Sequence, residues 1–212
     1  MTTDFPPGFF ERQDEGSDTA FYGPDRFVTH IDDGAIAAVG TLYTDLGITG
    51  RVLDLMSSWV SHFDDPPEHL TVLGMNRREL DGNAMAAERV VHDLNADPTL
   101  PFADESFDDA VCCVSVDYLT RPVEVFAEVA RVLRPGGRFV TTFSNRCFPT
   151  KAIRGWLAND DEAHCRIVAA YFEASGAFEP ATVDVRVPPG RGVDPLFAVW
   201  AVSAETGTSL RN

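Results

Sequence analysis

Seven short, nearly continuous apolar runs divide the chain, and they constrain its fold more than any other feature. They cover residues 51–55, 70–75, 89–94, 108–116, 138–144, 182–188 and 195–202. Strands that are apolar on both faces are typical of parallel sheets covered by helices on each side. The runs therefore predict an α/β protein built around one sheet of seven strands.

Helical patterns lie between these runs. Apolar residues recur at helical spacing over residues 33–46, 122–133 and roughly 160–175, and RPGG at 134–137 ends the second segment with a turn. Such alternation predicts an open, doubly wound, mostly parallel sheet. The connection at 188–192 is too short for a crossover helix, so the last two strands should form an antiparallel hairpin.

Length and composition indicate a single domain over residues 1–212. Residues 1–20 are polar and should lie loosely on the surface, and residues 1–30 as a whole form an N-terminal lid or loose segment. Residues 203–212 should be a flexible tail. No apolar run approaches the ~20 residues that span a bilayer, and the N-terminus lacks signal-peptide features. We therefore expect a cytoplasmic protein with no membrane association, either a monomer or a homodimer.

The charge balance is strongly acidic. The net charge is -16, and the single lysine is Lys151. A polyphosphate would be repelled, so we expect no nucleic-acid partner. The chain has many carboxylates, and its basic residues are almost all arginine instead of lysine. This composition is typical of a halophilic, acidic proteome. The four cysteines form no C-x-x-C pair and no Cys/His grouping with zinc spacing, so we expect no metal site.

Three stretches carry a resemblance to a known family. VLDL (52–55), LPFADESFDDAV (100–111) and EVARVLRPGGRFV (128–140) resemble motifs of class I S-adenosylmethionine-dependent methyltransferases, in the branch that includes ubiquinone and menaquinone biosynthesis enzymes. The similarity covers residues 51–145 well. It implies a Rossmann-like fold, S-adenosylmethionine as cofactor, and a site beyond the carboxyl ends of the strands.

The resemblance assigns the methionine end of the cofactor to the loop after the first strand. Asp54 would order this loop and help to receive the methionine moiety. The family pattern is G-x-G-x-G, whereas this chain has Met56, Ser58 and Val60 at the glycine positions. Ser57 and Ser58 could offer hydroxyl and backbone N–H groups to the methionine carboxylate. Alternatively, the loop only packs, with Trp59 filling a cavity.

The next three strand ends would hold the adenosyl group. Asn76 stands where the family has an acid that accepts the ribose hydroxyls, and it could instead cap the following helix. Asp93 would accept from the adenine amino group, with Leu94 packing on the ring, although Asp93 could also cap a turn. Ser115 would line the floor between cofactor and acceptor.

The acceptor side has fewer signals. Arg146, Lys151 and Arg154 lie within nine positions of a chain poor in cations, so they could form a rim for a carboxylate or phosphate. Pairing with surface acids is the competing interpretation. Tyr22, Arg26 and His30 could reach the acceptor from the lid, and His30 and Tyr118 are the catalytic candidates. Alternatively, His30 is a surface or capping residue, and Tyr118 is buried with a satisfied hydroxyl.

The sequence thus favours methyl transfer from S-adenosylmethionine to a small, possibly anionic molecule. In-line displacement at an activated donor needs little acid–base chemistry, so the absence of a triad pattern is compatible with this function. The alternative is a catalytically inactive methyltransferase-like binding or regulatory protein. A nicotinamide-dependent dehydrogenase is disfavoured, because it too would need a glycine-rich loop after the first strand.

Overall fold

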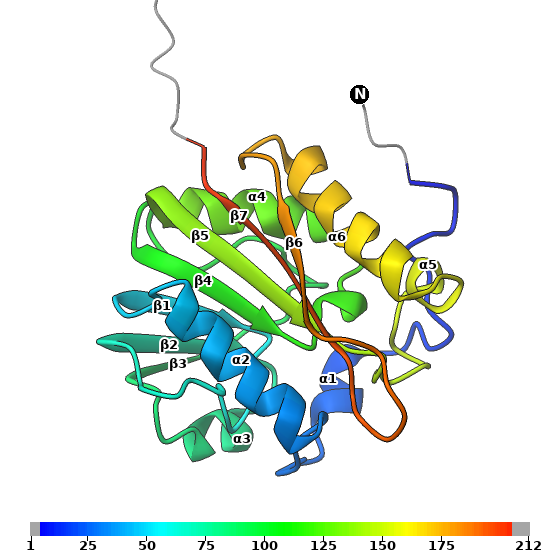
Figure 1. Ribbon diagram of the computed structural model, residues 1–212, viewed down its shortest axis with the longest axis horizontal. Helices are drawn as coiled ribbons and strands as arrows, with labels where there is room; N and C mark the ends of the chain where they lie inside the picture. Colours follow the sequence, from blue (N-terminus) through cyan, green and yellow to red (C-terminus); the bar gives the residue numbers. More distant parts are fainter. Residues whose placement is uncertain (1–4, 205–212) are drawn as a thin grey trace, which may run out of the picture.

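One sheet of seven strands organises the protein (Figure 1). The computed structural model describes residues 5–204, and the strand order is β3-β2-β1-β4-β5-β7-β6. The strands are β1 (Arg51–Leu55), β2 (His69–Gly74), β3 (Glu88–Val91), β4 (Phe107–Cys113), β5 (Leu133–Phe143), β6 (Thr182–Val187) and β7 (Leu196–Val202).

The pairing confirms the predicted topology. β1 pairs in parallel with β2 and β4, and the parallel ladder continues to β3 and β5, whereas β7 pairs antiparallel with β5 and β6. The chain runs outward in opposite directions from β1 and β4. In such sheets the crevice for a ligand opens beyond the carboxyl ends of the strands at this switch point.

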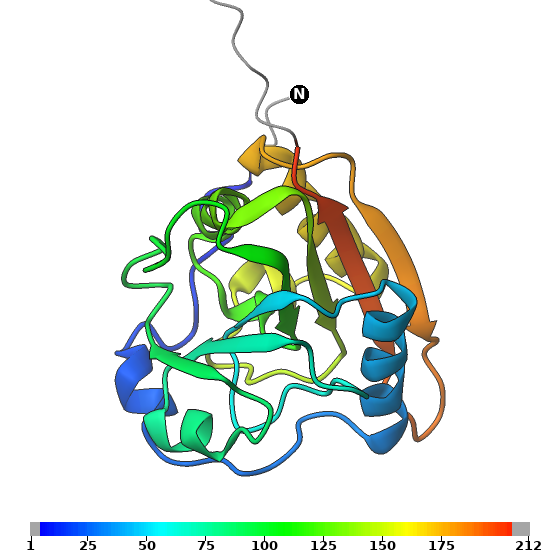
Figure 2. The same cartoon turned by 90° about the vertical axis from the view of Figure 1, so that its left-hand side faces the viewer.

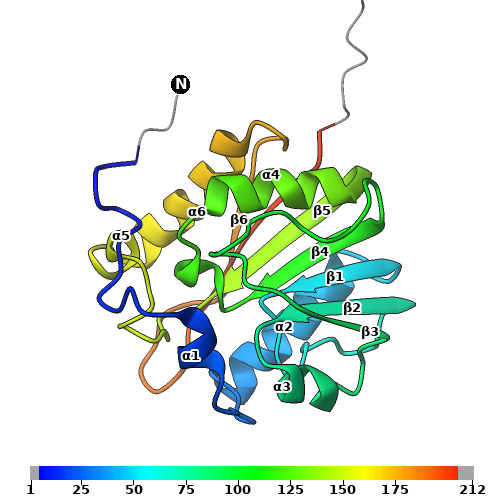
Figure 3. The ribbon, with the colours of Figure 1, turned by 180° about the vertical axis from the view of Figure 1, so that it is seen from behind.

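Helices cover both faces of the sheet (Figures 2 and 3). They are α1 (Asp18–Tyr22), α2 (Asp33–Asp45), α3 (Arg77–Gly82), α4 (Pro122–Val132), α5 (Arg154–Leu157) and α6 (Asp161–Ser175). One apolar core joins α4 and α6 to the sheet, and a second core joins α2 and α3 to its other face. Asp32 caps α2 by accepting from the Ala35 N–H at 2.8 Å, and Gly176, in the left-handed conformation, ends α6.

Two strands end earlier than the apolar runs predicted. β3 stops at Val91, so residues 92–94 form a loop, and β4 stops at Cys113. A short 3-10 helix, η1 (Val116–Tyr118), follows β4. The runs continue past these strands because the loop residues Leu94 and Val116 are also buried in the core.

The prediction that residues 1–20 lie loosely on the surface is wrong for the described part, which begins at residue 5. Phe5 and Phe10 pack against the buried ring of Tyr171, at centroid distances of 5.5 and 6.2 Å. Asp18 is 5% exposed and accepts two hydrogen bonds from Arg12, each 2.8 Å long. Aromatic burial and a buried ion pair therefore fix this segment. Residues 205–212, most of the predicted tail, lie outside the described residues.

Candidate cofactor and acceptor site

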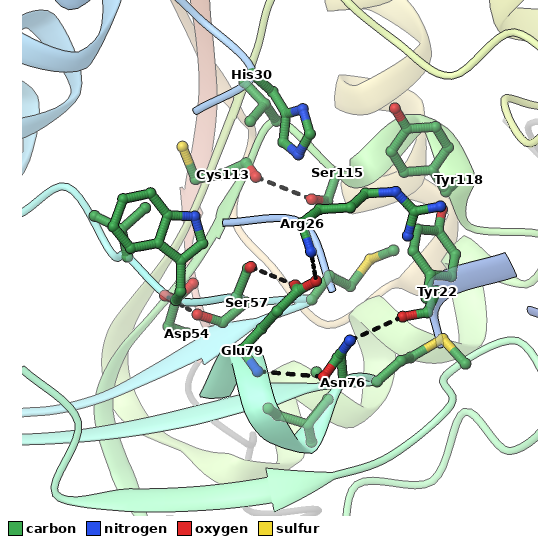
Figure 4. A pocket seen from close by; sticks show the side chains of 18 of the residues that line it. Tyr22, Arg26, His30, Asp54, Ser57, Asn76, Glu79, Cys113, Ser115 and Tyr118 are labelled. Atoms are coloured by element: carbon green, nitrogen blue, oxygen red, sulfur yellow. Dashed lines mark hydrogen bonds between the residues drawn. The ribbon is translucent and has the colours of Figure 1, made fainter. Parts of the chain in front are cut away.

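A cavity of about 320 Å³ lies beyond the carboxyl ends of β1, β2 and β4 (Figure 4). The candidate residues predicted from the sequence line it, with the exception of Lys151 and Arg154: Tyr22, His30, Asp54, Met56, Ser57, Ser58, Asn76, Asp93, Leu94, Ser115, Tyr118 and Arg146. The parallel topology brings these residues together, because each cofactor candidate follows a strand whose end faces the same crevice.

The loop after β1 keeps part of the geometry expected of a glycine-rich loop. Met56, at the first glycine position, has φ of 53°, a left-handed conformation that glycine adopts far more readily. Ser58 and Val60 do not share it. The Ser57 N–H donates to the Leu73 carbonyl at 2.8 Å. This close approach needs Gly74, because a Cβ there would lie 2.2 Å from the Ser57 carbonyl oxygen.

Asp54 lies beneath this loop and is 3% exposed. The Ser57 hydroxyl donates to its Oδ2 at 2.7 Å (Figure 4). Burial raises the pKa of Asp54 to about 7, and the hydrogen bonds from Ser57 and Ser61 oppose that rise. Asp54 therefore links the loop to the cavity and changes its charge near neutral pH.

Asn76 acts as the cap of α3. Its Oδ1 accepts from the N–H groups of Arg78 and Glu79, at 3.0 and 3.2 Å. Its Nδ2 donates to the carbonyls of Tyr22 and Gly23 and to the Asp25 carboxylate, at 3.3, 3.1 and 3.1 Å. Both ends of the amide are therefore engaged within the protein: the oxygen as the helix-cap interpretation predicted, and the nitrogen by contacts that it did not predict.

We call residues 22–30, the segment that reaches Asn76, the strap, and four side chains hold it. One is Arg78, which forms an ion pair with Asp25. Besides Asn76, Glu79 accepts from the Arg26 N–H at 2.6 Å, and the Trp59 indole donates to the Val28 carbonyl at 3.1 Å. Glu79 also accepts from the Ser58 hydroxyl at 2.6 Å. Sequence reasoning missed Glu79. Its spacing of three residues from the cap Asn76 was the available signal.

The residues assigned to adenine lie at the end of β3. Asp93 Oδ1 accepts from the N–H groups of Asn95 and Ala96, at 3.0 and 3.2 Å, so it caps a turn. Its Oδ2 makes no hydrogen bond within the described residues. Leu94 is 4% exposed and faces the cavity from the core. Across from it, the Ser115 hydroxyl donates to the Cys113 carbonyl at 3.0 Å.

The catalytic candidates differ in what they can do. The Tyr118 hydroxyl accepts from the Phe148 N–H at 2.9 Å, and burial raises the pKa of Tyr118. Tyr118 is thus an anchor for the loop at 148 and a poor base. Partial desolvation lowers the pKa of His30, although the residue is exposed, and this favours the neutral imidazole that can accept a proton. Burial raises the pKa of Tyr22, and its hydroxyl has no partner in the described residues.

The predicted cationic rim is only partly present, and Lys151 does not belong to it. Lys151 is fully buried, and its ammonium lies 3.0 Å from Asp18 and 3.1 Å from Asp14. It closes the ion network that fixes the N-terminal segment, so its charge is not available to a ligand. Arg154 pairs with Glu11 at 2.8 Å. Arg146 lines the cavity and pairs with Asp194 at 2.7 Å.

Two features of the described residues bear on other classes of function. No group of three or more His, Cys, Asp or Glu side chains within residues 5–204 is arranged to hold a metal ion. Over the same range, every helix is too short or too polar to cross a bilayer.

Sequence comparisons identify related methyltransferases. Residues 45–141 match the family model described as a methyltransferase domain. The UbiE ubiquinone/menaquinone biosynthesis C-methyltransferase of Paracoccus denitrificans is 40% identical over 86 residues, which are 40% of this chain and 33% of the relative. The biotin biosynthesis bifunctional protein BioHC of Teredinibacter turnerae is 28% identical over 140 residues, 62% of this chain and 24% of the relative. The chain thus spans about a quarter to a third of the length of these relatives.

Structure comparisons give the same fold. A Thermotoga maritima S-adenosylmethionine-dependent methyltransferase, described as a possible histamine N-methyltransferase, superposes with a TM-score of 0.58 at 16% identity, over 81% of this chain and 91% of its own. The [4+2]-cyclase SpnF superposes with a TM-score of 0.61 at 14% identity, over 88% of this chain and 90% of its own. The strand order and the crevice at β1 and β4 therefore define a Rossmann-like methyltransferase fold. Together with the sequence match over residues 45–141, they support assignment to the class I S-adenosylmethionine-dependent methyltransferase superfamily.

Proposed function

We propose that the protein transfers the methyl group of S-adenosylmethionine to a small, anionic acceptor. The observation that carries this proposal is the cavity at the switch point, which is lined by the candidates for every part of the cofactor. Since the fold also occurs in a cyclase, the proposal rests on the cavity residues together with the sequence match, and not on the fold alone.

Two ends of the cofactor fit the side chains present. Asp54, when ionised, would receive the ammonium of the methionine moiety, and the Ser58 backbone would face its carboxylate, since the Ser57 N–H is held by the Leu73 carbonyl. The left-handed Met56 holds that backbone in place. At the other end, the free Asp93 Oδ2 would accept from the adenine amino group, with Leu94 and Ser115 beside the ring.

The ribose end requires a rearrangement of the strap. Asn76 is 9% exposed, and its amide is engaged by Tyr22, Gly23 and Asp25. The strap therefore acts as a lid that must release Asn76 before this residue contacts a ribose. Lids of this kind exclude water from the reacting groups once they close again.

When bound, the cofactor supplies an activated methyl group on a sulfonium. The protein's contribution is then to hold the acceptor in line with that methyl group and to keep water out. His30, in its neutral form, would accept the proton of an acceptor hydroxyl or amine. Arg146 retains two terminal nitrogens beyond the Nε that binds Asp194, so it would add positive potential at the cavity, although Asp194 offsets its charge.

Calorimetric titration of the purified protein with S-adenosylmethionine and S-adenosylhomocysteine, in molar salt, tests the cofactor assignment. Micromolar dissociation constants are expected for both ligands. Asp93→Ala should weaken both by about tenfold through the lost charge-assisted bond, whereas the exposed Asp97→Ala on the same loop should not. Millimolar or undetectable binding to the wild-type protein would refute the proposal.

The second candidate is a methyltransferase-like binding protein without catalysis. The engaged amide of Asn76 favours it, because the position expected to receive the ribose is in use elsewhere. Two results together would support this second function over the first. The protein would bind S-adenosylhomocysteine with micromolar affinity, and it would transfer no methyl group from S-adenosylmethionine to any acceptor in a broad panel of small molecules.

A further inference from the structure

Arg26 stands apart from the other cation of the cavity. Arg26 and Arg146 are the arginines that line it, and Arg146 is neutralised by Asp194. None of the ion pairs formed within residues 5–204 includes Arg26. Its guanidinium instead donates to the carbonyls of Phe21 and Pro24, at 2.7 and 3.2 Å. Three of its five N–H donors are therefore left for a ligand.

Aromatic rings surround this cation. The guanidinium carbon lies 4.8 Å from the ring centre of Phe21, 5.6 Å from Phe148 and 5.9 Å from Tyr22. These contacts fix the plane of the guanidinium, and they reduce its contact with water. An arginine held in this way is oriented in advance for a planar anion.

The aromatic wall continues from Arg26 into the cavity. The ring of Tyr118 lies 6.0 Å from that of Phe148 at an interplanar angle of 34°, and the His30 ring lies 5.2 Å from Phe148. Phe148, Tyr118 and His30 all line the cavity, and Figure 4 shows His30 and Tyr118 on the same side of it as Arg26. A flat ring could pack on this wall at the separations that aromatic pairs favour.

We infer that the acceptor is an aromatic carboxylate, with its carboxylate on Arg26 and its ring on the wall formed by Phe148 and Tyr118. The unpaired guanidinium selects a carboxylate over a neutral amide or an amine, and the wall selects a flat ring over a saturated one. His30 then lies beside the ring, where it can take a proton from a ring substituent. This inference rests on the proposed function, since it names the acceptor class of the same site.

Binding of four small probes tests it without knowledge of the natural acceptor. Cinnamate, cinnamamide, cinnamylamine and 3-cyclohexylpropanoate are titrated into the wild-type protein with and without S-adenosylhomocysteine. Cinnamate should bind at least tenfold tighter than each of the other three. Absence of cinnamate binding, or binding no tighter than that of cinnamamide or cinnamylamine, overturns the inference.

Variants locate the selectivity. Arg26→Gln should weaken cinnamate by tenfold or more and leave cinnamamide unchanged, and Arg26→Lys should give an intermediate loss because the charge stays and the planar fork is lost. The matched control is Arg191→Gln, an exposed arginine outside the cavity, which should change neither. Phe148→Leu should weaken cinnamate and cinnamamide alike. Equal loss of both probes in Arg26→Gln, with unchanged circular dichroism, would also overturn the inference.

The outcomes separate this inference from the proposed function. If S-adenosylhomocysteine binds with micromolar affinity and cinnamate shows no preference, the acceptor class is wrong and the cofactor assignment of the proposed function stands. If cinnamate shows the Arg26-dependent preference while S-adenosylhomocysteine does not bind, the carboxylate site stands and methyl transfer is wrong.

Discussion

Replacing Asn76 by aspartate should open the strap. The Asn76→Asp variant would keep the cap of α3, because asparagine and aspartate cap helices about equally well. It would lose the Nδ2 donor, which now serves two carbonyls and the Asp25 carboxylate at 3.1–3.3 Å. In its place, a carboxylate oxygen would face three acceptors, one of which carries a negative charge.

The magnitude follows from these contacts. A fully buried acceptor without a donor costs about 1–3 kcal/mol, and these part-buried acceptors should cost less because water can reach them. The two like charges would repel by about 1 kcal/mol at 4 Å in bulk water, less the compensation that Arg78 gives Asp25. The contacts of Glu79 and Trp59 with the strap are unaffected. We therefore expect strap closure to weaken by about 2–3 kcal/mol, with a smaller effect on global unfolding, because the exposed strap can detach alone.

Hydrogen exchange at the Arg26 amide measures this change, since that N–H is protected by Glu79 at 2.6 Å. A loss of about 2 kcal/mol corresponds to exchange about 30-fold faster. S-adenosylhomocysteine should bind more tightly to this variant, because the open strap leaves a carboxylate for the ribose hydroxyls. Adding Asp25→Asn should restore part of the protection, since the amide introduced at position 25 can donate to the carboxylate introduced at position 76, while the ion pair of Asp25 with Arg78 is lost. Unchanged exchange in Asn76→Asp, or no rescue by Asp25→Asn, would refute the role assigned to Asn76.

Three further predictions concern the loop, the buried ion network and Asp54. Met56→Gly should change the unfolding free energy by no more than about 1 kcal/mol, because relief of the strained left-handed backbone offsets the lost burial and the added chain entropy of glycine. The same variant should bind S-adenosylhomocysteine several-fold more tightly in titrations. Weaker binding would show that the Met56 side chain contacts the cofactor. Lys151→Met should lower the free energy of unfolding, measured by urea denaturation, by about 3–5 kcal/mol, because it leaves Asp18 buried without this partner. Arg154→Met, which breaks an exposed ion pair, should lower it by no more than about 1 kcal/mol. Equal effects of the two variants would contradict the buried network. S-adenosylhomocysteine affinity should rise about tenfold from pH 6 to pH 8, because an Asp54 pKa of about 7 makes the carboxylate largely protonated at the lower pH and ionised at the higher. Asp54→Asn should abolish the rise; a rise that persists in this variant would assign it to another group of the cavity, where His30, His62 and His92 also lie.

The stability contribution of Asp54 has the opposite sign from its effect on binding. Its folded-state pKa of about 7 lies above the ordinary value of 3.8, so between about pH 4 and pH 7 the folded state binds more protons than the unfolded state. Stability from this group is therefore present at low pH and is lost as the pH rises through 7. Ionised Asp54 would thus strengthen binding of the cofactor ammonium, whereas the same ionised form lowers the stability of the fold.

The sheet could be predicted from the sequence because its signal is local. Most strands coincide with a short stretch rich in apolar residues, and the turn at 188–192 fixes the hairpin by its length. The cofactor candidates Asp54, Asn76 and Asp93 follow from the same pattern, because each stands at or just after the end of a strand. Parallel topology then brings them to one cavity.

The contacts that sequence reasoning missed are long-range and depend on side chains of ordinary type. Glu79 reaches the Arg26 amide across 53 positions, and Lys151 reaches the Gly16 carbonyl across 135 positions. Lys151 drew attention because it is the only lysine, and its rarity indicated a special environment without indicating which one. Burial among Asp14 and Asp18 explains it as well as a ligand would have done.

The strap gives a physical reason for asparagine at position 76. A carboxylate there would serve a ribose better, but it could not donate to the Tyr22 and Gly23 carbonyls. Asparagine can cap α3 with its oxygen and hold the strap with its nitrogen, which no acid can do. The residue that departs from the expected pattern is therefore the one that couples the lid to the adenosyl end of the cavity. Releasing Asn76 from the strap uses part of the binding free energy of the cofactor, so the net affinity is lower. Weaker cofactor affinity and a tightly held lid therefore both follow from this side chain.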